Sequence, residues 1–194
     1  MEDSDMVIKI RIHGRGGQGV VMAAQMISAA AFHEGLFSRS FATYGIARRG
    51  SPVTSFAMVG ERNEMTRSKI YEPDCVIVLD PRLPRVLNVL EGIRQNGTLI
   101  QNTAKSPGEA LEAPKSGVKR LRVGVVDATS IALRVLGSPV TNTATLGAFA
   151  RVTEMVSLDS MLKAVERSFK GELVEKNLAA TRLGYDEVRV ETFG

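Results

Sequence analysis

The spacing of apolar and polar residues changes several times along the chain, and each change marks a new predicted element. Residues 7–12 alternate apolar and polar side chains, which predicts a first strand. From Gln18 onward apolar residues recur at steps of four, three and four, so we expect a helix that ends at Gly35. Residues 75–80 are continuously apolar up to Asp80, which is typical of a central parallel strand. Further strands are predicted at residues 36–45, 53–60, 97–102 and 121–127.

Helical patterns separate these strands and fill the last third of the chain. One helix is expected over residues 82–95, and a loop over residues 103–119. Asp127, Asn142 and Ser157 precede helical stretches and are predicted to cap them; a final helix is expected over roughly 173–183. Alternating strands and helices predict a three-layer, Rossmann-like α/β fold with a mostly parallel central sheet and helices on both faces. No linker is evident, so residues 1–194 are expected to form a single domain.

Composition excludes several classes of protein. Hydrophobic residues make up 44% of the chain and charged residues 24%, which indicates a globular protein. Aromatic residues make up only 5% and tryptophan is absent, so base stacking is not expected. The net charge of +4 is mild and suits an acidic partner or a phosphorylated ligand as well as it suits nucleic acid. No nucleic-acid-binding motif accompanies it, so no nucleic-acid partner is predicted.

The single cysteine and the absence of long apolar runs restrict the cofactors and the compartment. Cys75 cannot form an intramolecular disulfide, and one thiol cannot hold an iron–sulfur cluster or a structural zinc. Its apolar neighbours predict an inert, buried thiol. The run of low polarity at residues 20–32 is too short to cross a bilayer, and the acidic start of the chain does not resemble a signal peptide. We therefore expect a cytoplasmic protein without a membrane partner.

A glycine-rich loop between the first strand and the first helix is the strongest candidate for binding chemistry. Its G-x-G-x-x-G spacing matches a dinucleotide fingerprint, and Arg15 adds a cation beside the helix N-terminus. The predicted second strand has no acid at its end to hold a ribose, and Glu34 falls at the end of the helix instead. No Gly-Lys-Ser/Thr follows the loop. A dinucleotide, another phosphate ligand, and a tight turn or docking edge all remain open.

The other polar residues form no recognisable catalytic set. The two histidines, His13 and His33, lack the spacing of a metal-binding pair. Asp80 stands at a strand end, where active-site groups often lie. Arg48 and Arg49 occupy a predicted loop, which is either a solvated basic turn or a turn that binds an anion or a partner subunit.

Several segments together resemble one protein family. The segments "HGRGGQG", "YGIARRGSPV", "EPDCVIVLD", "VVDATSIALRVLG" and "NTATLGAFARV" occur in this order. They resemble the gamma subunit of 2-oxoacid:ferredoxin oxidoreductases of the pyruvate synthase group, over residues 7–188. The sequence Gly50-Ser51-Pro52-Val53 is similar to the branch that acts on pyruvate or branched-chain 2-oxoacids.

This resemblance implies a role inside a larger complex. Such complexes decarboxylate a 2-oxoacid oxidatively with coenzyme A, giving an acyl-CoA, carbon dioxide and reduced ferredoxin. Thiamine diphosphate lies between alpha and beta subunits and iron–sulfur clusters lie mainly in a delta subunit, so the gamma chain is implied to hold no cofactor or redox centre alone. The glycine loop is expected at a subunit interface near coenzyme A or thiamine. The implied binding residues are Gly14, Arg15, Gly16, Gly17, Gln18, Gly19, Arg49, Asn142 and Thr143.

A second interpretation keeps the fold but not the complex. The chain can also be read as a free-standing Rossmann-like domain that binds a nucleotide or acts as a scaffold. A soluble monomer without partner chains would favour this interpretation, whereas exposed apolar docking surface would favour the subunit.

Overall fold

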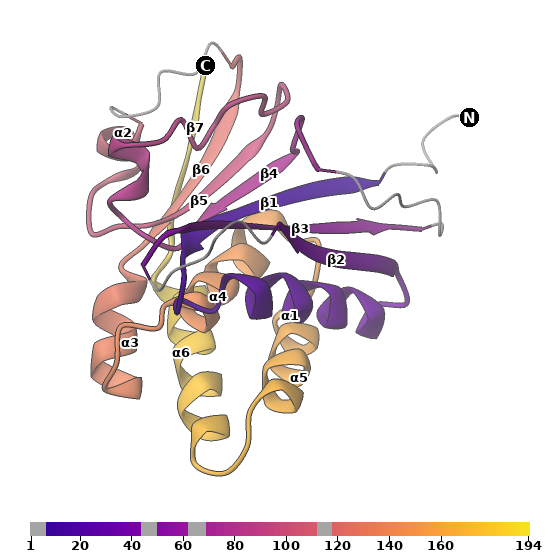
Figure 1. Cartoon of the computed structure of the whole chain (residues 1–194), viewed down its shortest axis with the longest axis vertical. Coiled ribbons are helices and arrows are strands. Elements are labelled where there is room, and N and C mark those ends of the chain that lie inside the picture. Colours follow the sequence, from indigo (N-terminus) through magenta and orange to yellow (C-terminus); the bar gives the residue numbers. More distant parts are fainter. Residues whose placement is uncertain (1–6, 44–49, 62–68, 112–117) are drawn as a thin grey trace.

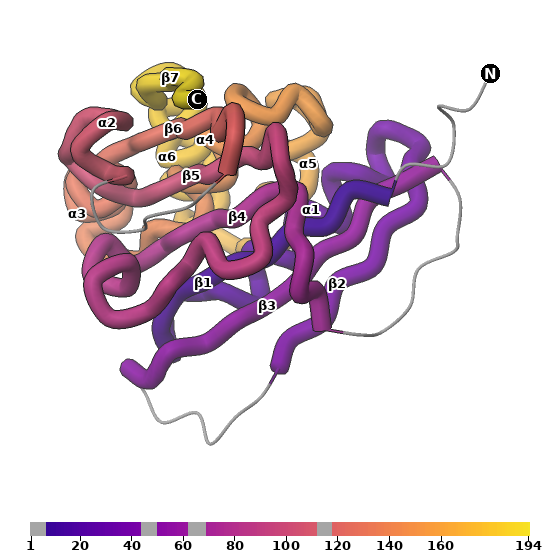
Figure 2. Tube along the Cα trace, turned by 90° about the horizontal axis from the view of Figure 1, so that it is seen from above, coloured from indigo at the N-terminus to yellow at the C-terminus, as the bar shows by residue number. Residues whose placement is uncertain are grey.

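A computed structural model describes residues 7–43, 50–61, 69–111 and 118–194. These residues form one seven-stranded sheet in the order β2-β3-β1-β4-β5-β6-β7, which Figure 2 shows from one edge to the other. The four central strands, β1, β4, β5 and β6, are parallel, and β3, β2 and β7 join antiparallel at the two edges. The strands are β1 (Ile8–Arg15), β2 (Phe37–Thr43), β3 (Pro52–Gly60), β4 (Cys75–Val78), β5 (Thr98–Asn102), β6 (Leu121–Val126) and β7 (Arg189–Phe193).

The two faces of the sheet are covered unequally. Five of the described helices lie on one face, below the sheet in Figure 1: α1 (Val20–His33), α3 (Ala128–Leu136), α4 (Asn142–Thr153), α5 (Leu158–Ser168) and α6 (Leu173–Glu187). The opposite face is covered by the connection after β4, which includes the 3₁₀ turn η1 (Leu83–Arg85), and by the short helix α2 (Pro107–Ala110). The predicted α/β fold with a mostly parallel centre is confirmed.

Strand β4 shows how the sequence builds both cores. Cys75 and Ile77 pack against the helical face, while Val76 and Val78 pack against the opposite face. All four side chains are buried, as the continuous apolar run predicted. Burial raises the pKa of the Cys75 thiol far above its ordinary value, so the prediction of an inert thiol is confirmed.

The helix predicted over residues 82–95 is wrong. Only Leu83–Arg85 forms a single 3₁₀ turn, and the rest consists of turns that press apolar side chains onto the sheet. Arg11, which projects from β1 onto this face, donates hydrogen bonds to the backbone oxygens of Val89 and Glu91. In a helix these oxygens would accept from the following turn, so the buried arginine takes the place of helical hydrogen bonds here.

Two of the three predicted helix caps are confirmed. Asp127 Oδ1 accepts from Ser130 N at 3.0 Å, and Ser157 Oγ accepts from Ser160 N at 3.1 Å. The third prediction is wrong, because Thr141 is the cap residue of α4 and Asn142 is the first residue of the helix.

The C-terminal end of the chain and the loop after β5 contain elements that the sequence did not predict. Helix α6 extends to Glu187 instead of ending near residue 183, and β7 then pairs antiparallel with β6. β7 is mostly exposed and polar, so it carries little of the period-two signal that reveals a strand. Helix α2 lies inside the predicted loop, and its cap residue Ser106 forms a capping box with Glu109.

Candidate functional site at the glycine loop

The glycine loop connects the end of β1 to the start of α1. Gly17 and Gly19 have φ angles of 95° and 73°, a left-handed region that glycine adopts without strain. A Cβ atom at Gly19 would collide with the side chain of Asn142, the first residue of α4. Asn142 is 1% exposed, so the loop is closely packed against a second helix N-terminus. Gly17 is therefore required by the turn, and Gly19 by both the turn and the packing.

A single carboxylate, Asp80, holds the loop in place. Its Oδ2 accepts from Arg15 Nε at 3.0 Å and from Gln18 Nε2 at 3.1 Å, while its Oδ1 accepts from the backbone N–H of Arg82 at 2.8 Å. Gln18 Oε1 in turn accepts from the backbone N–H of Arg15 at 2.7 Å. Because Asp80 lies two residues after the end of β4, the carboxyl end of one central strand anchors the loop that follows its neighbour β1. Asp80 thus serves the structure of the loop, although its position at a strand end also suited a catalytic group.

The same loop is tied to the residues that precede β3. Gly16 N donates to Ser51 O at 3.0 Å, and Gly50 N donates to Gly16 O at 3.2 Å. Arg15 Nη1 also donates to Gly50 O at 3.1 Å. The guanidinium of Arg15 is therefore engaged with Asp80 and Gly50, and is not the free cation that the sequence suggested.

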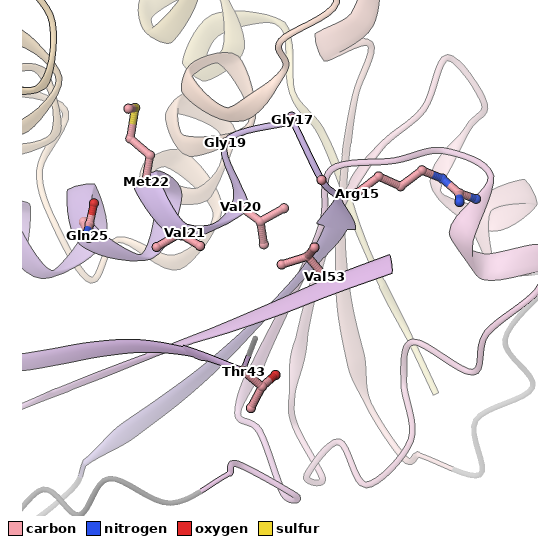
Figure 3. A pocket seen from close by; sticks show the side chains of 10 residues that line it. Arg15, Gly17, Gly19, Val20, Val21, Met22, Gln25, Thr43 and Val53 are labelled. Carbon is pink, nitrogen blue, oxygen red and sulfur yellow. The ribbon is translucent and has the colours of Figure 1, made fainter. Parts of the chain in front are cut away.

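A cavity of about 430 Å³ lies between the start of α1 and the antiparallel strands β2 and β3. In Figure 3 the side chains of Val20 and Val53 lie near each other beside it, while Arg15 extends away. The cap residue of α1 is Gly19, which has no side chain, so the N–H groups of the first turn lack a capping side chain at this cavity. The cavity is lined by Arg15, Gly16, Gly17, Gly19, Val20, Val21, Met22, Gln25, Thr43 and Val53.

None of the described residues that line this cavity carries a carboxylate, and the candidate ribose ligand Glu34 lies elsewhere. Glu34 follows α1, and its Oε1 accepts from the backbone N–H of Ser157 at 2.8 Å. The hydrogen bonds from Ser157 hold the pKa of Glu34 below its ordinary value. Glu34 thus joins α1 to the start of α5, and the acid that a dinucleotide site requires is missing among the lining residues.

The structure brings together most, but not all, of the residues predicted for the site. Gly14 to Gly19 and Asn142 form one cluster. Thr143 is fully buried and donates from Oγ1 to Asn177 Oδ1 of α6 at 3.0 Å, so its side chain does not reach the cavity. Arg48 and Arg49 lie outside the described residues.

The two buried polar residues of β1 face the other side of the sheet. Arg11 Nε donates to His13 Nε2 at 3.1 Å, and both side chains are buried. Burial, and then the charge of Arg11, lower the pKa of His13 to about 4, so His13 is neutral near pH 7. His13 is neutral and accepts a hydrogen bond from Arg11, which serves the structure of the fold, so neither residue shows a catalytic role. Sequence reasoning missed this pair because an alternating strand places arginine at a position that usually faces solvent.

Two other features are absent from the part of the chain that the structure describes. The described residues contain no group of three or more histidine, cysteine, aspartate or glutamate side chains placed to bind a metal ion. None of their helices has the length and apolar character needed to cross a membrane.

The fold and the loop define an α/β protein with a glycine-rich turn at the carboxyl edge of a parallel sheet. Comparison with known proteins shows which family of such proteins the chain resembles. The family model described as pyruvate ferredoxin/flavodoxin oxidoreductase matches residues 9–187. The chain is 46% identical to the pyruvate/ketoisovalerate oxidoreductases common subunit gamma of Pyrococcus furiosus, covering 95% of this chain and 98% of the relative. It is 45% identical to the pyruvate synthase subunit PorC of Methanocaldococcus jannaschii, with 94% and 97% covered.

A solved structure agrees with these relatives. The pyruvate oxidoreductase subunit PORC of Thermotoga maritima superposes with a TM-score of 0.83 at 35% identity, covering 95% of this chain and 98% of that one. The chain therefore belongs to the pyruvate ferredoxin/flavodoxin oxidoreductase family, and within it corresponds to the gamma subunit. The family resemblance found in the sequence motifs is confirmed.

Proposed function

We propose that this chain is the gamma subunit of a complex that oxidatively decarboxylates pyruvate or a branched-chain 2-oxoacid with coenzyme A. The products are an acyl-CoA, carbon dioxide and reduced ferredoxin. The observation that carries the proposal is the match, over nearly the whole of both chains, to a gamma subunit named as common to pyruvate and ketoisovalerate oxidoreductases. A shared subunit of this kind explains why the same chain would serve both substrates.

Within that complex we assign the chain a positioning role without a redox centre, in the cytoplasm. Its one cysteine is buried with a raised pKa, so it is unsuited to ligate a cluster or attack a substrate. Asp80 is committed to the glycine loop and His13 to Arg11. Thiamine diphosphate, the iron–sulfur clusters and the contact with ferredoxin are accordingly assigned to the alpha, beta and delta subunits.

We assign the cavity at the glycine loop to coenzyme A at an interface with a partner subunit. A helix N-terminus provides N–H donors for a phosphate, and Val20, Val21 and Val53 provide apolar surface for a long flexible chain. The missing carboxylate argues against a nicotinamide dinucleotide. Arg49 and Asn142 remain predicted contributors to this site.

The complex itself provides the first test. The protein is purified anoxically from its own cells with its partners and assayed for coenzyme A-dependent reduction of a viologen dye. Pyruvate, 2-oxoisovalerate and 2-oxoglutarate are compared as substrates. Activity with pyruvate or 2-oxoisovalerate supports the proposal. A chain that purifies alone and inert would instead support the free-standing nucleotide-binding domain.

A variant of the cavity separates the coenzyme A assignment from the subunit assignment. Val21→Phe should fill part of the cavity and raise the KM for coenzyme A, while the KM for the 2-oxoacid stays unchanged. Val190→Phe, on the exposed face of β7, is the matched control. An unchanged KM for coenzyme A would remove the assignment of this cavity and leave the subunit assignment intact.

A further inference from the structure

We propose that the chain contains a second binding site, for a small molecule that carries a phosphate group next to an N–H or O–H donor. The site is a cavity of about 310 Å³ at the carboxyl end of β5, on the sheet face opposite α1. It shares no lining residue with the glycine-loop cavity, and the proposal does not depend on the function assigned there. The lining residues are Pro81, Arg82, Pro84, Arg85, Gln101, Thr103, Lys105, Glu109 and Ala110.

The charge of this cavity favours an anion. Arg82, Arg85 and Lys105 bring three cationic side chains from two segments that meet at the carboxyl edge of the sheet. No described residue pairs with the guanidinium groups of Arg82 and Arg85, and both residues are exposed. Arginine binds phosphate with two parallel hydrogen bonds, so two such groups at one cavity suit a phosphate better than a single charge would.

One acidic residue also lines the cavity, but its carboxylate is already engaged. Glu109 Oε2 accepts from the backbone N–H of Ser106 at 2.9 Å and from Ser106 Oγ at 2.6 Å. These hydrogen bonds hold the pKa of Glu109 below its ordinary value, and Ser106 Oγ caps α2 in return. With Glu109 included, the described side chains that line this cavity still have a positive net charge.

A second observation, independent of the charge, also points to a ligand: a buried hydrogen-bond acceptor at this cavity has no partner. Gln101 is the fourth residue of β5, is 4% exposed, and lines the cavity. Its Oε1 is buried and accepts no hydrogen bond. Such an unpaired atom costs free energy unless a ligand or water supplies a donor. Because this oxygen is shielded from solvent, the Gln101 amide must turn toward the cavity before a ligand N–H or O–H beside the phosphate can satisfy it.

The place of this cavity in the fold agrees with the chemistry of its side chains. Gln101 and Thr103 lie at the carboxyl end of β5, and Arg82 follows β4, so the cavity opens where parallel α/β sheets usually bind ligands. The backbone N–H of Arg82 is held by Asp80, the same carboxylate that fixes the glycine loop. The segment that presents the two arginines is therefore positioned before any ligand arrives.

Calorimetric titration of the full chain with ADP, inorganic pyrophosphate and adenosine tests the proposal. We expect ADP and pyrophosphate to bind and adenosine not to bind. Arg82→Gln combined with Arg85→Gln should lower the affinity for ADP and for pyrophosphate at least about tenfold, because each arginine contributes charged hydrogen bonds. Arg167→Gln combined with Lys170→Gln removes the same charge from the exposed end of α5 and should leave both affinities unchanged.

Gln101→Leu tests the unpaired amide separately. This variant should lower the affinity for ADP by about threefold to tenfold, which is the effect of one lost hydrogen bond. The affinity for pyrophosphate should fall less. Because the amide oxygen has no partner in the protein, the melting temperature of this variant should not fall, which shows that the loss is not one of folding. The proposal is overturned if neither anion binds at millimolar concentration. It is also overturned if the α5 control weakens binding as much as the arginine variant, or if Gln101→Leu leaves ADP affinity unchanged.

Discussion

At the scale of single residues, one carboxylate determines the shape of the glycine loop. Asp80 is 6% exposed and accepts from Arg15, Gln18 and Arg82. Asp80→Asn keeps the size of the side chain but removes the charge and one acceptor, leaving the partly buried Arg15 without its anionic partner. We expect a loss of about 1 to 3 kcal/mol in the free energy of unfolding, measured by urea titration. The control is Asp159→Asn, which breaks the exposed ion pair with Lys163 on α5 and should lower the free energy of unfolding clearly less. An equal loss in both variants would contradict the role of Asp80 in holding the loop.

The pKa of His13 predicts a dependence of stability on pH. Burial lowers this pKa from its ordinary value of 6.5 to about 4 in the folded chain. Between these values the unfolded chain binds a proton that the folded chain does not, so stability is complete above pH 6.5 and falls as the pH drops toward 4. The linkage is worth about 3 kcal/mol across this window.

A matched variant isolates this contribution. His13→Gln cannot titrate, but its amide oxygen can still accept from Arg11 Nε. Unfolding free energies at pH 7 and pH 4.5 should therefore differ more for the natural chain than for the variant. The same difference in both proteins would show that His13 does not take part in the acid response.

At the scale of elements, two glycines allow α4 and α6 to pack closely. A Cβ atom at Gly147 would meet the backbone oxygen of Thr181, and one at Gly184 would meet that of Ala144. Gly147→Ala should force the helices apart and cost about 1 to 3 kcal/mol, although alanine favours helix more than glycine does. Gly108→Ala in α2 meets nothing closer than Phe193 at 3.9 Å and is the control. Thermal unfolding of both variants measures the difference, and equal melting temperatures would show that the contact can relax.

The elements also show how far the sequence could predict the fold. The central strands were predictable because β4 is buried on both faces and carries only apolar residues. A helix was wrongly predicted over residues 82–95 because their apolar residues have helical spacing. In the structure Arg11, which is distant in the sequence, donates hydrogen bonds to backbone oxygens of this segment. β7 pairs through its backbone and exposes its side chains, so no pattern marks it. The spacing of apolar residues indicates only which side chains are buried. The structure of residues 82–95 and of β7 depends instead on hydrogen bonds to residues far along the chain.

The candidate site was predictable to a similar extent. Four clustered glycines between a strand and a helix identified the loop, and its motif identified the family. The sequence did not indicate that Asp80 would neutralise Arg15, or that Thr143 would face Asn177 instead of the cavity. These relations depend on which elements meet in space. The unpaired oxygen of Gln101 is likewise visible only once β5 and the segment after β4 lie side by side.

At the scale of the whole molecule, both cores share the same strands, which leads to a prediction about cooperativity. In β4, Ile77 belongs to the core on the helical side and Val78 to the core on the opposite side; β5 is shared in the same way by Ile100 and Leu99. Neither core can lose its packing without disturbing a strand that supports the other. The full chain should therefore unfold as a single domain in one two-state transition.

Two variants, one in each core, test this prediction. Ile77→Ala and Val78→Ala each delete buried methyl groups, and each should lower the melting temperature of the whole chain, with a loss of about 2 to 5 kcal/mol for isoleucine and less for the smaller valine. Calorimetry should give one peak whose calorimetric and van't Hoff enthalpies agree, in the natural chain and in both variants. Two peaks, only one of which shifts in each variant, would show that the two faces unfold as separate units. Because β4 is buried between both cores, we expect the single peak.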